Sequence, residues 1–219
     1  MEPISIIALS MGAAWASGIN LYATLFMLGY MGASGNMTLP PELEVLSNPM
    51  VMTAAGFMYC VEFFADKIPG VDSSWDTIHT FIRIPAGAML AASAVGDVTP
   101  AMELTAALLG GSLAAGTHAT KMGSRLLINT SPEPVSNWTA SITEDFLVIA
   151  GLWAALQHPA LFVIGLIVFI GLMIWILPKL WRLIKRVCYR IGSWLGFCDP
   201  IDEVLESDLV KLADHQPDN

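Results

Sequence analysis

The chain has 219 residues, of which 13% are charged and 55% are hydrophobic, and its mean hydropathy is +0.62. A soluble domain carries about 25% charged residues, so this composition excludes an ordinary soluble enzyme. The net charge of −9 mostly describes the C-terminal end, because seven of the nineteen carboxylates lie between residues 199 and 218. We expect an all-α integral membrane protein with one membrane domain, residues 1–178, and no nucleic-acid partner.

Six apolar runs, separated by proline, glycine or charged residues, predict about six transmembrane helices, since a bilayer core takes about 20 apolar residues per helix. The runs cover residues 4–32, 49–65, 77–95, 101–128, 138–156 and 160–177. The first and fourth runs are longer than a perpendicular span requires, and both contain glycine clusters and polar residues near the middle. We therefore expect these two runs to be tilted, kinked or interrupted.

Basic residues in the short loops predict the orientation. Lys67 follows the second run, Lys121 and Arg125 end the fourth, and five Lys and Arg residues lie between 179 and 190. The loops at 34–48, 96–100 and 157–159 contain neither Lys nor Arg. Because basic loops stay in the cytoplasm, the pattern predicts that both termini are cytoplasmic.

The two halves of the chain, residues 4–95 and 101–177, are partly similar. Residues 11–20 align without gaps on residues 109–118, with coinciding small residues and with Asn20 on His118. Each half holds three spans, so a duplication would place the copies in opposite topology. The similarity predicts two inverted three-helix repeats; the alternative is that small-residue packing recurs by chance.

Small residues at four-residue spacing in the first and fourth runs predict a seam of closely packed helices. Gly18 and Gly116, close before Asn20 and His118, would also let the backbone open and present carbonyl groups to a substrate. A packing seam without any opening is the alternative.

Ionisable residues inside apolar runs are functional candidates because burying a charge in a bilayer is costly. We predict that a substrate or ion pathway is lined by Asn20, Glu62, His118, Glu144 and Asp145. His118 could exchange protons with the carboxylates, since its unperturbed pKa is near 6.5. Structural ion pairs with nearby Arg or Lys residues are the alternative.

A second acidic segment follows the second run. Asp66, Asp72, Asp76 and His79 could face one mono- or divalent cation, although their spacing matches no established metal motif. Solvated capping residues are the alternative. Arg83, Lys121 and Arg125 are the candidate contacts for an anion or a lipid headgroup.

The C-terminal end changes character after residue 178. Residues 179–198 have basic side chains on one helical arc and apolar side chains opposite, which predicts an amphipathic juxtamembrane helix that binds anionic lipid through residues 179–190. A plain extension of the sixth span is the alternative. We expect residues 199–219 to form a flexible acidic tail.

Several stretches resemble a family of bacterial multi-pass membrane proteins catalogued as a domain of unknown function. They are ADKIPGVD at 65–72, WD at 75–76, HTF at 79–81, HATK at 118–121 and SPEP at 131–134. The resemblance covers about residues 5–178. It implies a helical membrane fold in the bacterial inner membrane, and it names no activity or substrate.

Three functions agree with these patterns. The first is a small transporter or channel, which could be coupled to a proton or a cation and which forms a homo-oligomer because six short helices barely enclose a pathway. The second is a membrane enzyme or lipid flippase that acts on a phosphorylated headgroup with the acidic segment as its metal site. The third is a non-catalytic membrane scaffold.

Overall fold

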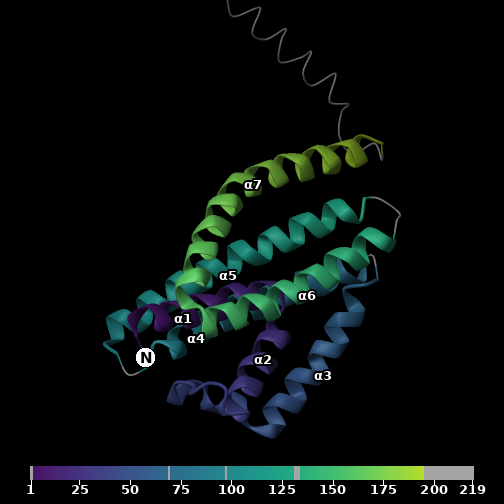
Figure 1. Cartoon of the computed structure of the whole chain (residues 1–219). Helices are drawn as coiled ribbons and strands as arrows, with labels where there is room; N and C mark the ends of the chain where they lie inside the picture. The colour runs from purple at the N-terminus through teal and green to yellow at the C-terminus, as the bar shows by residue number, and fades with distance from the viewer. Residues whose placement is uncertain (1, 69, 97, 131–133, 195–219) are drawn as a thin grey trace, which may run out of the picture. The chain divides into compact units, whose positions relative to one another are not determined.

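A computed structural model describes residues 2–68, 70–96, 98–130 and 134–194, and within them every regular element is a helix (Figure 1). The elements are α1 (Pro3–Ile19), α2 (Leu21–Ala33), the 3₁₀ helix η1 (Pro41–Ser47), α3 (Pro49–Ala65), α4 (Val71–Ala94), α5 (Pro100–Ile128), α6 (Pro134–Gln157) and α7 (Pro159–Trp194). The chain divides into two compact units, Met1–Leu177 and Pro178–Asn219.

Local sequence signals define where several helices begin. Pro49 and Pro100 each occupy the first position of a helix, where the missing N–H costs nothing. The Asn48 side chain accepts a hydrogen bond from the Met50 amide at 2.9 Å, and Thr99 accepts one from the Met102 amide at 3.4 Å. These caps explain why α3 and α5 begin close to where the apolar runs predicted.

The first apolar run forms two helices that meet at Asn20. The backbone of Asn20 is extended, with φ −145° and ψ 100°, and its side-chain oxygen accepts a hydrogen bond from the Ala23 amide at 2.9 Å. Asn20 thus ends α1 and caps α2. The two helices diverge from this residue (Figure 1), so the predicted interruption of the first run occurs.

The fourth run, by contrast, forms one continuous helix, α5, through Gly116 and His118. The Gly116 carbonyl accepts a hydrogen bond from the Thr120 hydroxyl at 2.8 Å. A Cβ atom added at Gly116 would lie 2.7 Å from the Met173 sulfur, so this glycine makes room for a side chain of α7. The predicted backbone opening at Gly116 is therefore wrong.

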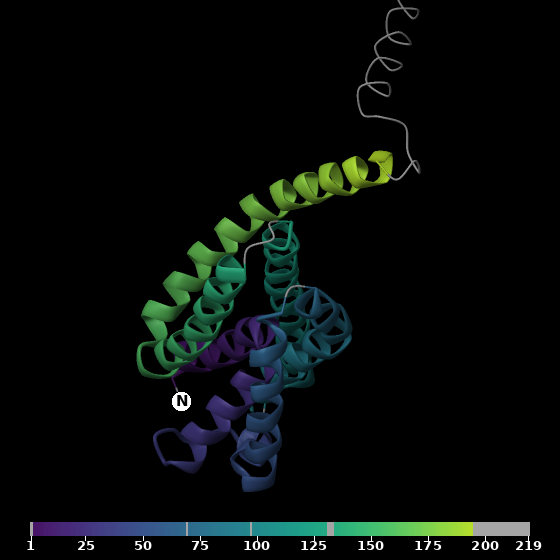
Figure 2. The same cartoon turned by 90° about the vertical axis from the view of Figure 1, so that its right-hand side faces the viewer.

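The centre of the first unit is a seam of small residues where α1, α4 and α5 pack together (Figures 1 and 2). A Cβ atom added at Gly18 would lie 2.6 Å from the Ala114 carbonyl oxygen. One added at Gly110 would lie 3.3 Å from the Ala14 Cβ, and the Ser10 hydroxyl donates to the Ala91 carbonyl at 2.8 Å. Close backbone approach of this kind is how helices associate where burying apolar area gains little.

The same contacts give the helix directions. Gly18 lies beside Ala114, and Ala14 lies beside Gly110, so α1 and α5 run in parallel. Inverted repeats require the equivalent helices to cross a membrane in opposite directions. The helix directions therefore do not support inverted repeats. The glycines coincide in the two sequences because α1 and α5 contribute facing small residues to one seam.

Side chains on the outer faces of the helices are largely apolar. Phe57, Phe81 and Phe146 are 67%, 81% and 68% exposed, whereas many charged side chains are buried. Two stretches, Val135–Gln157 and Pro159–Arg186, are long and apolar enough to cross a membrane. Length and composition of two helices give weak support for a membrane location.

The second unit begins at Pro178 and continues α7 as far as Trp194. Within it, the Lys185 ammonium lies 5.4 Å from the centre of the Trp181 ring. The basic segment predicted at 179–198 is thus helical through residue 194, as an extension of α7. Residues 195–198 and the predicted tail at 199–219 lie outside the described residues.

The seam leads to a first prediction. Gly18→Ala should lower the free energy of unfolding by about 1–3 kcal/mol, because the new methyl group overlaps the Ala114 carbonyl. Thermal unfolding in detergent, followed by tryptophan fluorescence, measures the change. Gly171→Ala is the matched control, since a Cβ atom added there meets nothing within 4 Å. Equal unfolding temperatures for the two variants would contradict the packing described here.

Candidate functional site

Two facing polar stripes on α4 and α5 build the centre of the site. On α4 the stripe is Asp72, Asp76, His79 and Arg83, and on α5 it is His118, Lys121 and Arg125. Spacings of three and four residues place each set on one helix face. All seven side chains are buried, and α4 packs closely against α5.

Arg83 connects the carboxylates of two helices. One terminal nitrogen of its guanidinium donates to Asp76 Oδ1 at 2.9 Å, and the other donates to Glu62 Oε1 from the end of α3. The side chains of Arg83 and Glu62 are fully buried. An arginine that holds two buried carboxylates keeps its charge and fixes the relative position of α3 and α4.

His118 is a neutral imidazole in this arrangement. Its Nδ1 lies 3.1 Å from an Arg83 terminal nitrogen, which can only donate, so Nδ1 accepts. The proton is then on Nε2, which lies 3.1 Å from the Asp76 carbonyl and 2.8 Å from the Thr80 hydroxyl. Both ring nitrogens are therefore engaged by protein groups.

Lys121 is surrounded by oxygen atoms from four elements. Its ammonium nitrogen lies 2.8 Å from Asp66 Oδ2, 3.1 Å from the Ile19 carbonyl, 3.5 Å from Asp76 Oδ1, and 3.7 Å from both Glu62 Oε1 and Glu144 Oε2. An ammonium group has three hydrogens, so not all five oxygens receive a hydrogen bond. The ammonium occupies an oxygen-rich position of the kind that attracts cations.

Arg125 holds α6 against the site. Its Nε and one terminal nitrogen donate to the two Glu144 oxygens at 3.2 and 2.6 Å. Its other terminal nitrogen donates to the Asp66 and Asn137 carbonyls, each at 3.1 Å. We call Glu62, Asp66, Asp76, Arg83, Lys121, Arg125 and Glu144 the charged network.

The helix break at Asn20 contacts both the charged network and Asp145, which follows Glu144 in the chain. The Asn20 amide group donates to Asp145 Oδ1 of α6 at 3.0 Å. The carbonyl of Ile19, the last residue of α1, accepts from Lys121. Because α1 ends at this position, the Ile19 carbonyl is free to accept a hydrogen bond from Lys121. In a continuous helix this carbonyl would accept from a main-chain amide one turn further on.

Lys67, just after α3, lies beside the charged network. Its ammonium donates to the Phe63 carbonyl at 3.0 Å and to the Ser141 hydroxyl at 3.2 Å, and it lies 3.0 Å from the centre of the Phe63 ring. Burial lowers the pKa of this ammonium from its ordinary value. Lys67 is thus a buried charge of the protein interior and does not extend into water.

Four buried carboxylate oxygens have no hydrogen-bond donor among the described residues: Glu62 Oε2, Asp66 Oδ1, Asp76 Oδ2 and Asp145 Oδ2. Buried acceptors without donors are costly. Apart from Asp72, whose carboxylate accepts from amide groups at the start of α4 and from Asn129, the region holds five carboxylates, from these four residues and Glu144, against the cations Lys67, Arg83, Lys121 and Arg125. With His118 neutral, the formal excess is one negative charge.

The predicted pathway residues Asn20, Glu62, His118, Glu144 and Asp145 all lie in this region, as does the predicted seam residue Gly18 near Asn20. Arg83, Lys121 and Arg125, predicted as anion or headgroup contacts, are instead ion-paired with carboxylates. Glu62 and Glu144 thus form the structural ion pairs given as the alternative, whereas Asp145 is bonded to Asn20.

The four residues predicted to hold one cation are not brought together. Asp66 and Asp76 contact Lys121, whereas Asp72 accepts from the Asn129 amide at 2.9 Å and His79 contacts Tyr22 at 3.2 Å. Among the described residues, no group of three or more His, Cys, Asp or Glu is placed to hold a metal ion. Asp72 also accepts from the Gly70 amide, which is the role of a capping residue.

Sequence reasoning missed several polar partners. Ser141 and Asn137 lie one and two helical turns, respectively, before Glu144 and Asp145 on α6, and both are buried. Their spacing of four residues is visible in the sequence, so a search for a polar stripe on α6 would have found them. Thr80 has no such signal because hydroxyl groups are common on both exposed and buried helix faces.

These features define an all-helical protein whose charged side chains gather in its interior. Residues 7–179 match the family model described as Domain of unknown function (DUF4126), and the chain belongs to this family. The match confirms the resemblance seen in the sequence motifs. No curated protein and no solved structure matches the chain.

The ion pairs lead to a second prediction. Arg125→Met should lower the free energy of unfolding by about 3–5 kcal/mol, because Glu144 and two carbonyls lose their donor in a buried region. Chemical denaturation in mixed micelles measures the loss. Adding Glu144→Gln should recover part of the stability. Arg186→Met, at an exposed position of α7, is the control, and an equal effect of both Met variants would contradict a buried network.

Proposed function

We propose that this protein is a small membrane transporter or channel for a proton or a monovalent cation. The observation that carries the proposal is the charged network at the Asn20 break, with its unpaired carboxylate oxygens and its excess of one negative charge. The exposed side chains on the outer faces are largely apolar and many charged side chains are buried, which supports a bilayer location. Lipid contacts apolar side chains, and charged residues within a bilayer face the protein interior.

We propose that α3 to α7 cross the bilayer and that α1 and α2 enter it as a pair. Helix α1 leads toward the charged network at Asn20, and α2 leads away from it, beside the antiparallel α3. Ile7 and Ser10 line a pocket together with Val95 and Ala101, at the ends of α4 and α5 far from the network. Residues near the N-terminus thus belong to the face opposite Lys67 and Arg125.

This arrangement changes the expected sidedness of the N-terminus. The face with Lys67, Lys121 and Arg125 is cytoplasmic by the distribution of basic residues. The N-terminus, on the opposite face, is then outside the cytoplasm. The sequence-based expectation that both termini are cytoplasmic assumed that residues 4–32 cross the bilayer once, and the helix break at Asn20 removes that assumption.

Cysteine labelling tests this topology. In a variant without native cysteines, Glu2→Cys should react with a membrane-impermeant maleimide on intact cells, whereas Ser74→Cys, near the charged network, should react only after permeabilisation. Both positions are exposed to solvent or headgroups, so accessibility is matched. Equal labelling of the two positions on intact cells would overturn the proposed sidedness.

The unpaired oxygens favour a cation over an anion. Three of them, on Glu62, Asp66 and Asp76, belong to carboxylates whose other oxygen already faces Lys121. One further positive charge would neutralise the formal excess of the region. A proton on one carboxyl group or a monovalent cation supplies that charge, and Lys121 is the protein's own cation in the same oxygen-rich space.

Glu144 offers the route to this space. Its side chain is 17% exposed, compared with 0–4% for the other ion-paired carboxylates of the network. A cation that reaches Glu144 meets Asp66 and Lys121 next. Movement of a charge through the network then requires Lys121 or Arg125 to change hydrogen-bond partners. Both have a second carboxylate within 4 Å: Asp76 for Lys121 and Asp66 for Arg125.

Flux in proteoliposomes tests the proposal. The wild type should dissipate a proton or a sodium or potassium gradient, read with a pH-sensitive dye or an ion-sensitive electrode. Asp145→Asn should reduce flux to the level of protein-free liposomes, because it removes one buried charge and keeps the hydrogen-bonding shape next to Asn20. Glu103→Gln, an exposed carboxylate in the first turn of α5, is the matched control and should keep wild-type flux.

Thermal unfolding with added salts separates loss of function from loss of fold. Binding to the native state raises apparent stability, so the wild type should be stabilised by its cation and Asp145→Asn should not. Absence of flux and of any cation response in a well-folded wild type would reject the transporter proposal. The network would then serve to hold the helices together, and the scaffold function would take precedence.

A further inference from the structure

The basic segment of α7 after Pro178 is a second charged feature of the protein. Residues 146–198 contain no Asp or Glu, although residues 179–190 contain five Lys and Arg residues. Arg182, Lys185 and Arg186 are exposed, and no carboxylate of the described residues pairs with any of the three. The cations of the charged network, by contrast, are all paired with carboxylates. The positive charge of this segment therefore requires an anionic partner from outside the helix.

Helical spacing separates the basic and the apolar side chains of this segment. Arg182 and Arg186 lie one turn apart on the basic face, with Lys185 beside them. Leu180 and Ile184 lie on the opposite face and are partly buried. Like charges one turn apart on a helix repel each other. An anion bound between the two arginines would therefore remove a repulsion and add an attraction.

The two arginines have hydrogen-bond donors in an arrangement that suits a phosphate group. Arg182 Nε donates to the Pro178 carbonyl at 3.3 Å, and the terminal nitrogens of this guanidinium have no partner among the described residues. Arg186 likewise has no hydrogen-bond partner in the part of the chain that the structure describes. A guanidinium presents a planar fork of donors that matches the oxygens of a phosphate in pairs. The basic face thus offers two such forks one turn apart.

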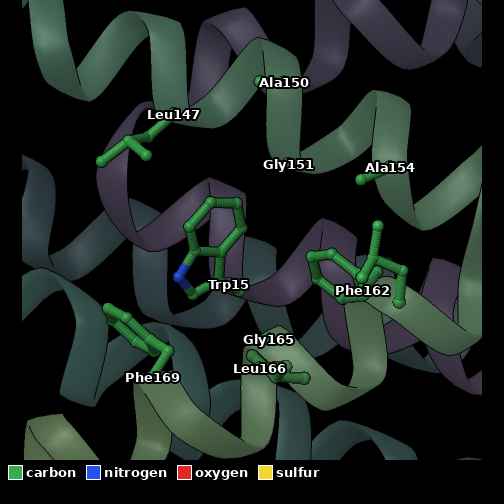
Figure 3. A pocket seen from close by; sticks show the side chains of 10 residues that line it. Trp15, Leu147, Ala150, Gly151, Ala154, Phe162, Gly165, Leu166 and Phe169 are labelled. Carbon is green, nitrogen blue, oxygen red and sulfur yellow. The ribbon is translucent and has the colours of Figure 1, made fainter.

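The first part of α7 belongs to the unit that holds the other helices. Phe162 and Phe169 pack edge-on against Trp15 of α1, at centroid distances of 6.0 and 5.9 Å (Figure 3). Residues 159–177 give a helix about 28 Å long, close to the thickness of a hydrocarbon core. If α7 crosses the bilayer as proposed, the basic segment after Pro178 therefore begins at a headgroup layer.

Trp181 agrees with a position in this layer. Its side chain is 60% exposed, and the Lys185 ammonium lies 5.4 Å from the centre of its ring. Tryptophan is enriched where a membrane meets water, because one part of the ring system is apolar and the indole N–H is polar. A lysine beside such a ring keeps its charged end at the headgroups.

We propose that the basic face of residues 179–186 binds the headgroups of anionic phospholipids and that Arg182 and Arg186 together hold one lipid phosphate. Leu180 and Ile184 then face the acyl chains. A free phosphate ion would neutralise the arginines but would leave this apolar face uncovered, which favours a lipid as the source of the phosphate. The inference rests on the proposed bilayer location of α7 and is independent of transport.

Fluorescence quenching by brominated lipids in proteoliposomes tests the site. In a full-length variant without native cysteines, Leu183→Cys carries a fluorescent maleimide beside the basic face, at a position that is 43% exposed. The vesicles contain phosphatidylcholine and phosphatidylglycerol, and only one of the two lipids is brominated in each sample. Phosphatidylglycerol should be enriched about two- to fivefold at the label, where fivefold is the effect of one basic residue near a membrane surface.

Variants of the two arginines test the phosphate contact. Arg182→Gln combined with Arg186→Gln should bring the enrichment to one, and 1 M salt should do the same because it shortens the screening length to about 3 Å. The matching pair of Lys substitutions keeps both charges and loses the forked donors, so it should keep only part of the enrichment. Thermal unfolding verifies that these variants are folded.

Leu161→Cys, near the other end of α7, is the matched control position. It is 64% exposed, and no Lys or Arg lies between residues 126 and 178, so both brominated lipids should quench a label there equally. Quenching at neither position would reject the bilayer location itself. Equal quenching at both positions by the two lipids would overturn this inference alone.

Three further results would overturn the proposal. They are an enrichment that survives the double Gln variant, an enrichment that does not respond to salt, and full enrichment in the double Lys variant. The seven carboxylates between residues 199 and 218 are the alternative partner within the chain. An enrichment that emerges only after removal of residues 199–219 would assign the basic face to them instead of to lipid. None of these results bears on cation flux, so the transporter proposal is tested separately.

Discussion

The rest of the first unit depends on the pairing of buried charge. Arg83, Lys121 and Arg125 have almost no exposed surface, and each would be very costly to bury alone. Their carboxylate partners come from the ends of α3 and α4 and from the middle of α6, so satisfying the cations determines which helix ends must meet. Apolar packing could not do this, because burial of apolar surface is non-directional.

The small-residue seam and the break at Asn20 make this pairing possible. Gly18 brings α1 against α5 closely enough for the Ile19 carbonyl to reach Lys121. Asn20 then ends the helix, caps the next one and holds Asp145 with the same side chain. One residue thus ends α1, caps α2 and binds Asp145. His118, the residue of α5 that aligns with Asn20 in the sequence, has none of these roles and lies inside a continuous helix.

Much of this could be predicted from local signals, and the rest depended on long-range contacts. Proline and capping residues predicted where α3 and α5 begin, and buried-charge reasoning selected Glu62, His118 and Asp145, all of which are buried. The inverted-repeat prediction failed because small residues at equal spacing reveal that two helices need close contact, but not their direction. The cation site at 66–79 failed because helical spacing could not reveal that Lys121 and Asn129 of α5 would take those carboxylates as partners.

The order of the charged residues along the chain has a consequence for biogenesis. Arg83 follows both of its carboxylate partners, so α3 and α4 can neutralise it as soon as α4 is made. Arg125 precedes Glu144 and Asn137, its partners on α6, by 19 and 12 residues. A nascent chain that has produced α5 but not α6 therefore carries Arg125 without its acceptors on α6. If α5 crosses a bilayer as proposed, its stable integration therefore depends on the later synthesis of α6.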